Sequence, residues 1–260
     1  MPKLAANISM MFAEHAFLDR IGAAADVGFR AIECQYPYAT PAEAFASAVS
    51  RHGLEAVLIN VPPGEGDFDR GFAAIPGAER EFVTSLERAL AYARTIGCKR
   101  IHVLAGRAAA TPGNEALYVL NLQRAAERAA ADGVTLLIEP LNAIDQPGYF
   151  LRTTGQAAAL LDRIARANVM LQFDYYHCQI SEGALTEHAG RLLPRTGHIQ
   201  IAGVPGRHEP DSGEFNCAYV LDHLDRIGYA HWVGAEYRPA GSTVGGLGWA
   251  RAWGITMGKG

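Results

Sequence analysis

The segment Val134-Thr-Leu-Leu-Ile-Glu139 is an apolar run that ends in a carboxylate, and Pro140-Leu141-Asn142 follows it directly. A continuous apolar run of this length is typical of a strand that is buried on both faces, as in a parallel sheet. A carboxylate inside such a strand would be costly to bury, but at the carboxyl end of the strand it can face a pocket. We therefore expect a buried parallel strand whose last residue, Glu139, reaches a site.

The same pattern, an apolar run with a polar residue at or near its end, recurs three times later in the chain. The runs are Val169–Asp174, His198–Ile201 with its amide at Gln200, and Trp232–Glu236. The polar residues lie about one barrel unit apart, and the carboxyl ends of parallel barrel strands face the same mouth. These side chains and Glu139 are therefore expected to meet.

A weak repeat of an alanine-rich helical stretch, a glycine and a short apolar strand runs through the whole sequence. The glycines are Gly28, Gly53, Gly97, Gly133 and Gly228. Glycine just past a helix adopts the left-handed conformation that closes the last turn. With three further strands expected at 4–9, 169–174 and 197–201, the chain has eight strands in 260 residues, the usual size of a (β/α)8 barrel.

We therefore predict an α/β protein that is a single (β/α)8 TIM-barrel domain over residues 1–260. Closure of the sheet is favoured because it removes exposed strand edges. An open doubly wound sheet is the alternative, but no G-x-G-x-x-G motif opens a helix after the first strand.

Helical patterns fill the segments between the expected strands. Residues 78–96 place apolar side chains at helical spacing. Pro41, after Thr40, is expected as the first helical residue behind an N-cap, and Thr154 and Asn216 are expected as N-caps of later helices.

Two connections, residues 61–77 and 202–215, are too long to be plain turns. Long loops that follow barrel strands lie at the C-terminal face, where the active sites of such barrels are built. We expect both loops to form walls or lids of a pocket.

Composition limits the partners. Lys and Arg total 23 against 27 Asp and Glu, and the net charge is −4, so a nucleic-acid partner is not expected. No apolar stretch is long enough for a membrane helix, and the N-terminus lacks the apolar region of a signal peptide. Cys34, Cys98, Cys178 and Cys217 are scattered and are expected to be reduced and mostly buried, as in a cytoplasmic protein.

The four polar strand ends predict a metal site. The carboxylates of Glu139, Asp174 and Glu236 would repel one another without a cation between them. Together with the amide oxygen of Gln200 they form a hard, oxygen-rich set, which favours Mg²⁺ or Mn²⁺ over zinc. The alternative is that individual carboxylates only pair with arginines at the rim of the barrel.

Several motifs give the chain a resemblance to the hydroxypyruvate isomerase family, which includes the 2-oxo-tetronate isomerases. They are Ala6-Asn-Ile-Ser-Met-Met-Phe12, Asn60-Val-Pro-Pro-Gly64, Leu137-Ile-Glu-Pro-Leu-Asn142, Phe173-Asp-Tyr-Tyr-His177, Gly197-His-Ile-Gln-Ile-Ala202, Gly206-Arg-His-Glu-Pro210 and Ala235-Glu-Tyr-Arg-Pro239. The resemblance covers nearly the whole chain and implies a xylose-isomerase-like barrel. It also implies the same four metal ligands, with Glu139 and Glu236 as the acid–base pair.

The resemblance implies an aldose–ketose type isomerisation of a short 2-oxo acid through an enediolate. The substrate is either hydroxypyruvate, giving tartronate semialdehyde, or 2-oxo-tetronate, giving 3-oxo-tetronate, and the motifs do not separate the two. A ketose 3-epimerase is the alternative within this class, although such relatives carry histidine where this chain has Gln200. A metal-dependent DNA-repair endonuclease and a non-catalytic sugar-acid binding barrel are the rivals from other classes.

Five side chains are candidates for holding the substrate: His177, Arg207, His208, Asn7 and Asn60. Arg207 and His208 are candidates for holding a carboxylate, since arginine can bind one with two parallel hydrogen bonds. His177 could bond a substrate hydroxyl. Each of these residues also has a purely structural alternative. The two loop residues could be solvent-exposed charges, His177 could hydrogen-bond a loop carbonyl, and the asparagines could cap turns.

Two further features have structural interpretations. His102 lies within the fourth strand and is expected to be a core histidine. Trp249 and Trp253 are expected to pack in the core or at a subunit contact of a homo-oligomer.

Overall fold

Eight parallel strands close into a barrel, in the order in which they occur along the chain. The computed structural model describes residues 1–66 and 70–256. The strands are β1 (Lys3–Asn7), β2 (Ala31–Cys34), β3 (Glu55–Asn60), β4 (Arg100–His102), β5 (Thr135–Ile138), β6 (Val169–Asp174), β7 (Thr196–Ile201) and β8 (Trp232–Ala235). Since β1 also pairs in parallel with β8, the closed barrel is confirmed and the open sheet is excluded.

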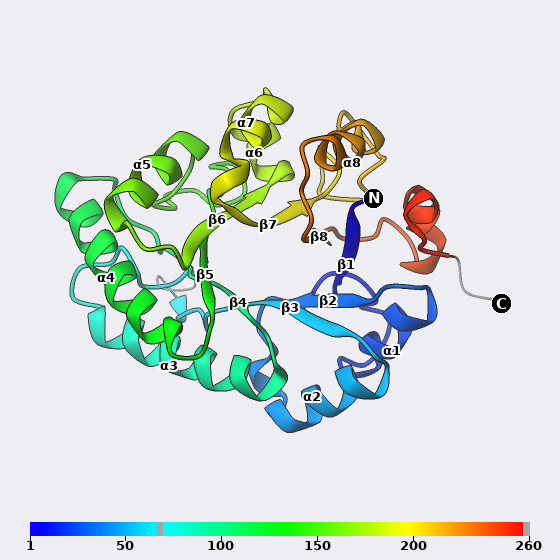
Figure 1. The fold of residues 1–260 in the computed structure, drawn as a ribbon, viewed down its shortest axis with the longest axis horizontal. Helices are drawn as coiled ribbons and strands as arrows, with labels where there is room; N and C mark the ends of the chain where they lie inside the picture. Colours follow the sequence, from blue (N-terminus) through cyan, green and yellow to red (C-terminus); the bar gives the residue numbers. More distant parts are fainter. Residues whose placement is uncertain (67–69, 257–260) are drawn as a thin grey trace.

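Helices surround the barrel, as Figure 1 shows. They are α1 (Asp19–Asp26), α2 (Ala42–Arg51), α3 (Glu79–Ile96), α4 (Pro112–Ala130), α5 (Thr154–Ile164), α6 (Tyr175–Ser181), α7 (Leu185–Leu192) and α8 (Cys217–Arg226), with 3₁₀ segments η1 (Pro37–Ala39), η3 (Leu193–Arg195) and η4 (Val244–Trp253). Two helices connect β6 to β7, and a 3₁₀ segment takes the place of an α-helix after β8. No helix in the described ranges is both long and apolar enough to span a bilayer.

The glycines of the sequence repeat have the expected role. Gly97 ends α3 with a φ of 71°, a left-handed conformation, and the repeat's other four glycines also have positive φ. Asn216 caps α8 through a bond from the backbone N–H of Tyr219, as predicted.

Two of the cap predictions are wrong. The N-cap of α5 is Thr153 rather than Thr154, whose backbone already lies in the helix and whose hydroxyl bonds Glu182. Pro41 has an extended ψ of 134°, so α2 begins only at Ala42 and has no side-chain cap.

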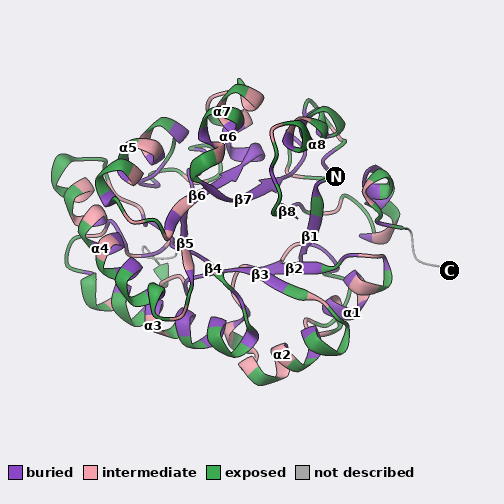
Figure 2. Cartoon of the chain, viewed as in Figure 1, coloured by how far each residue is buried: buried purple, intermediate pink, exposed green. Residues whose placement is uncertain are grey.

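The strands and the inner faces of the helices form the core, and the outer helix faces are exposed (Figure 2). All four cysteines are buried and free, as predicted. Trp249 is buried against Tyr237 and Trp253, which is consistent with the core packing expected for this segment. Polar side chains nevertheless enter the interior of the barrel at the carboxyl ends of the strands, where they build the site.

Candidate active site

A cavity of about 130 Å³ opens at the carboxyl ends of the strands. Glu139 and Glu236, which directly follow β5 and β8, both line it. The loop after β3 contributes Arg70, and the loop after β7 contributes Arg207. Both long loops therefore form walls of the pocket, as predicted; residues 67–69 of the first lie outside the described residues.

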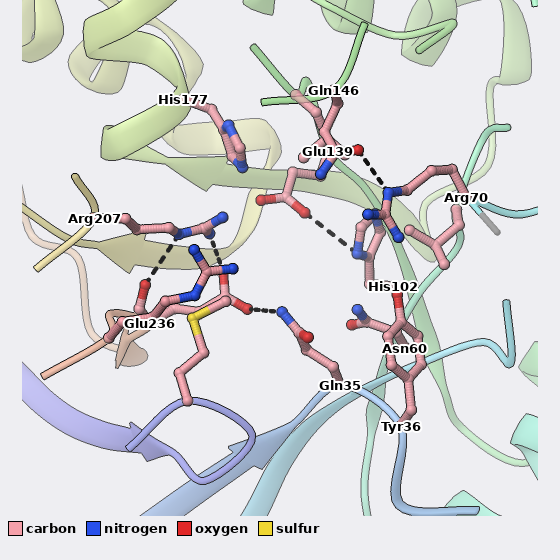
Figure 3. Close-up of a pocket in the computed structure, with 14 residues that line it drawn as sticks. Gln35, Tyr36, Asn60, Arg70, His102, Glu139, Gln146, His177, Arg207 and Glu236 are labelled. Atoms are coloured by element: carbon pink, nitrogen blue, oxygen red, sulfur yellow. Dashed lines mark hydrogen bonds and ion pairs between the residues drawn. The ribbon is translucent and has the colours of Figure 1, made fainter. Parts of the chain in front are cut away.

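Three buried carboxylates gather at this end of the barrel. Glu139 is 4% exposed, Asp174 3% and Glu236 4%. The guanidinium of Arg207 lies between two of them, with Nη2 at 2.9 Å from Oδ2 of Asp174 and in contact with Oε2 of Glu236. Figure 3 shows the contact of Arg207 with Glu236. The arginine also lies over the ring of Tyr176, 4.8 Å from its centroid. A cation therefore already joins two of the carboxylates.

Burial changes the acidity of these carboxylates. Burial, together with the charges of Asp174 and Glu236, raises the pKa of Glu139 well above its usual value. Burial raises the pKa of Glu236 to about 7, although Arg207 opposes the rise. Burial also raises the pKa of Asp174. A carboxyl group with a pKa near 7, as in Glu236, can both accept and return protons, as acid–base catalysis requires.

The residues at this site fit a divalent cation. Oε1 of Glu139 is buried and has no hydrogen-bond partner among the described residues, so one ligand atom is already desolvated. Carboxylate oxygens of Glu139 and Asp174 lie within 4.8 Å of each other and of a ring nitrogen of His177. Carboxylate oxygens at this density are the ligands that Mg²⁺ and Mn²⁺ prefer.

The hydrogen bonds of His177 decide which part it can play in this cluster. Its Nδ1 lies 3.2 Å from the backbone N–H of Asn142, which can only donate, so Nδ1 is the acceptor. Burial lowers the pKa of His177 well below its usual value, so the ring is neutral and its one proton is on Nε2. Nε2 lies 3.6 Å from Oδ2 of Asp174, and the side chain lines the cavity. His177 is therefore placed to donate a hydrogen bond, which suits a substrate oxygen better than a metal.

Gln200 is 1% exposed, pairs with Asp174 in the β6–β7 register and is not among the residues that line the described cavity. Its Nε2 donates to Oε1 of Glu33 over 2.7 Å, and its Oε1 accepts from Nε2 of Gln172 over 2.7 Å. A carboxylate can only accept, so Glu33 determines which end of the Gln200 amide faces it. The amide oxygen is thereby turned away from Glu33.

Glu33 is the centre of a buried polar network that the sequence did not reveal. It is 1% exposed and accepts from Asn7 as well as from Gln200, and Nε2 of His198 lies 2.6 Å from its Oε2. Asn7 also donates to Glu236 over 2.9 Å, so the network reaches the cavity. The signal was present but weaker, since Gly28–Glu33 also ends in a carboxylate, as Val134–Glu139 does, but Arg30 interrupts its apolar residues.

His102 is buried, as the core interpretation predicted, but it also contributes to the cavity wall. It is 1% exposed, but it is the last residue of β4 and lines the cavity, with Nδ1 at 3.3 Å from Oε2 of Glu139. Burial lowers its pKa to about 3, so the ring is neutral. Its side chain faces the barrel interior near the mouth. A histidine can therefore be buried and still line the cavity.

Only some of the remaining predicted substrate residues line the cavity. Asn60 and Arg207 line the cavity. Asn7 lies beneath it, on the Glu33 network, and His208 points to the backbone oxygen of Arg238 at 2.9 Å. Neither Asn7 nor His208 belongs to the described lining of this cavity.

The fold and the carboxylate cluster define a (β/α)8 barrel with buried ionisable groups around a cavity at the carboxyl ends of its strands. Residues 21–253 match the family described as xylose isomerase-like TIM barrel. The chain is 48% identical to a 2-oxo-tetronate isomerase of Cupriavidus necator, over 97% of this chain and 99% of the relative. It is 39% identical to the hydroxypyruvate isomerase of Escherichia coli, over 96% and 98%.

A crystal structure described as an AP endonuclease of family 2 from Brucella melitensis has a TM-score of 0.94 and 41% identity, covering 97% of this chain and 99% of the other. The chain therefore belongs to the family of hydroxypyruvate and 2-oxo-tetronate isomerases, within the xylose isomerase-like TIM barrels. The membership predicted from the sequence motifs is confirmed.

Proposed function

We propose that this protein is a metal-assisted isomerase of a short 2-oxo acid, with hydroxypyruvate or 2-oxo-tetronate as substrate. The observation that carries the proposal is that Glu139 and Glu236, both with raised pKa, line one small cavity. The names of the relatives support this choice of substrates.

We assign the metal to Glu139, Asp174, Gln200 and Glu236, and to Mg²⁺ or Mn²⁺. When bound, the cation would polarise the substrate carbonyl and stabilise the negative charge of the enediolate. In this assignment Arg207 exchanges part of its contact with Asp174 and Glu236 for contact with the substrate. The buried Oε1 of Glu139, which has no hydrogen-bond partner among the described residues, and the closeness of Glu139 to Asp174 support this set.

The protein's own groups carry the proton. In hydroxypyruvate, one glutamate removes the proton from C3 and the other glutamate delivers a proton to C2, while the hydroxyl proton moves from the oxygen on C3 to the oxygen on C2. The product is the isomeric hydroxy-aldehyde, and the same transfer turns a 2-oxo-tetronate into a 3-oxo-tetronate. Steps of this kind contribute about 10²–10⁴-fold each.

The neutral side chains around the glutamates hold the substrate oxygens. Nε2–H of His177 is placed to donate to a hydroxyl or enediolate oxygen. Asn60 also lines the cavity. Asn7 and Gln35 each donate to Oε1 of Glu236, which fixes the direction of that carboxylate.

A ketose 3-epimerase remains the alternative, because the same glutamate pair could invert a carbon that bears a hydroxyl. A DNA-repair endonuclease is less well supported, although the similar Brucella structure is described as an AP endonuclease. The net charge of −4 disfavours a polyanion, and the cavity of about 130 Å³ suits a small molecule.

A product assay tests the proposal. Purified enzyme is incubated with hydroxypyruvate, with a 2-oxo-tetronate and with a ketohexose, each with Mg²⁺, with Mn²⁺ and after chelation. We expect one of the two acids to be isomerised in a metal-dependent way. Conversion of the ketohexose alone would favour the epimerase, and no metal dependence would reject the metal assignment.

A further inference from the structure

The three arginines that line the cavity differ in what they face. Arg207 contacts the carboxylate cluster. Burial alone would lower the pKa of Arg207, but the charges of Glu236, Asp174 and Glu139 raise it. Arg70 enters from the other side of the pocket, with Glu139 between it and Arg207 in Figure 3. The positive charge of Arg70 is thus directed to the wall away from the Asp174–Glu236 pair.

The position of Arg70 is fixed by tight backbone packing. The next residue, Gly71, forms an antiparallel bridge with Ala105 and has a φ of 94°. A Cβ atom on Gly71 would lie 2.4 Å from Cβ of Leu104, so only glycine permits this approach. The backbone that carries Arg70 is therefore held against the segment that leaves β4.

The side chain of Arg70 is also held. Its Nε donates to Oε1 of Gln146 over 2.6 Å. Gln146 is itself fixed by a backbone bond from its N–H to the oxygen of Asn142. A guanidinium carries five N–H donors in a rigid fork, so it can bond an amide on one edge and a carboxylate on another.

Two neutral donors lie on the same wall as Arg70. Tyr36 and Asn60 both line the cavity, and Figure 3 shows both on the Arg70 side. Burial raises the pKa of Tyr36 to about 12, so its hydroxyl keeps its proton at neutral pH, and the charge of Arg70 acts on it. A guanidinium beside a hydroxyl and an amide is a set of groups that recognises a carboxylate.

We propose that Arg70, with Tyr36 and Asn60, forms the subsite for the substrate's carboxylate and so restricts the enzyme to anionic short oxo acids. The proposal rests on the proposed function, because it places the carboxylate opposite the groups that hold the reacting oxygens. It also differs from the sequence-based prediction that Arg207 and His208 hold this group. The anion would meet a positive wall in a pocket whose other wall is acidic.

The first test measures kinetics of Arg70→Met and Arg70→Lys with whichever acid the enzyme converts. A charged hydrogen bond to the substrate can be equally strong in the ground state and in the transition state. Losing such a bond raises KM and has little effect on kcat. We expect KM to rise roughly 10- to 100-fold in Arg70→Met, with partial retention in Arg70→Lys. A merely structural role of Arg70 would instead lower kcat or thermal stability in parallel.

The second test measures binding and does not depend on turnover. D-Glycerate and glycerol share a three-carbon skeleton and differ by a carboxylate, and their affinities for the Mg²⁺-loaded enzyme are compared by ligand-observed NMR. The wild type should prefer glycerate, and Arg70→Met should lose most of that preference. Arg128→Met, which removes an exposed arginine paired with Glu87 on the outer surface, should keep it.

The outcomes separate the two proposals. If neither acid is isomerised but glycerate is preferred and the preference needs Arg70, the proposed function fails and the subsite stands. If the preference for glycerate survives in Arg70→Met, or is absent in the wild type, the subsite is overturned. A loss of preference in Arg238→Met instead, the third arginine of the lining, would also overturn it.

Discussion

The carboxylate of Glu33 occupies the space where Gly234 would carry a side chain. A Cβ atom on Gly234 would lie 2.2 Å from Oε2 of Glu33 and 2.5 Å from its Oε1. Gly234 lies in β8, in register with Gln200 of β7. Glycine is therefore required at this position because a buried carboxylate, itself bonded to Gln200, lies against the strand.

The substitution Gly234→Ala should displace Glu33 and disturb the network beneath the site. We expect a loss of about 1–3 kcal/mol in the free energy of unfolding, as for overpacked cores, measured by urea denaturation. Gly155→Ala is the matched control, because its added methyl group would meet nothing within 4 Å and it lies in α5. Equal stability of Gly234→Ala and the wild type would show that Glu33 can move without cost.

The substitution Glu33→Gln removes a carboxylate that three side chains contact at the same time. Asn7, Gln200 and His198 all meet this carboxylate, and an amide would present an N–H₂ group to some of them. If Glu33 orients Gln200 toward a metal, Mn²⁺ should bind roughly 10- to 100-fold more weakly, measured by isothermal titration.

A matched control is Glu55→Gln, since Glu55 also accepts a side-chain hydrogen bond but is exposed. It should leave Mn²⁺ affinity unchanged. Unaltered Mn²⁺ affinity in Glu33→Gln would restrict Glu33 to a structural role.

The raised pKa of Glu236 predicts the pH dependence of stability in the metal-free protein. With a native pKa of about 7 against an ordinary value of 4.5, the native state holds a proton that the unfolded state has already lost between these pH values. The native state then binds more protons, so its stability falls as pH rises through this window. The change is about 3 kcal/mol at most, since one pKa unit corresponds to about 1.4 kcal/mol.

The Glu236→Gln variant isolates this contribution, because glutamine resembles the protonated carboxyl and does not titrate. In chelated protein, the wild type should lose stability relative to Glu236→Gln between about pH 5 and pH 8, as measured by urea denaturation. A difference that stays constant over this range, or that changes in the opposite direction, is incompatible with the raised pKa.

Much of the fold could be predicted because each unit of the barrel carries local signals. The apolar runs predicted the strands, and Gly97 illustrates how a helix-ending glycine marks the next one. The cap positions at Pro41 and Thr154 were off by one residue, because the side chain that caps a helix depends on backbone angles that the residue type does not fix.

The site was easiest to predict where a polar residue follows an apolar run. Glu139 and Glu236 were found in this way, and both line the cavity. Arg70 was not, because it lies on a long loop whose course depends on the contact of Gly71 with Leu104. His102 was missed because a histidine inside a strand gives no signal of which way it faces.

Proton exchange with solvent tests the central claim most directly. Substrate is incubated in D₂O with Mg²⁺ and the wild type, Glu139→Gln, Glu236→Gln or the surface control Glu115→Gln, and deuterium incorporation at carbon is followed by ¹H NMR. We predict incorporation with the wild type and with Glu115→Gln, and a decrease of about 10²–10⁴-fold in each of the other two variants. Incorporation at the wild-type rate in both Glu139→Gln and Glu236→Gln would contradict the assignment of these two glutamates as the acid–base pair.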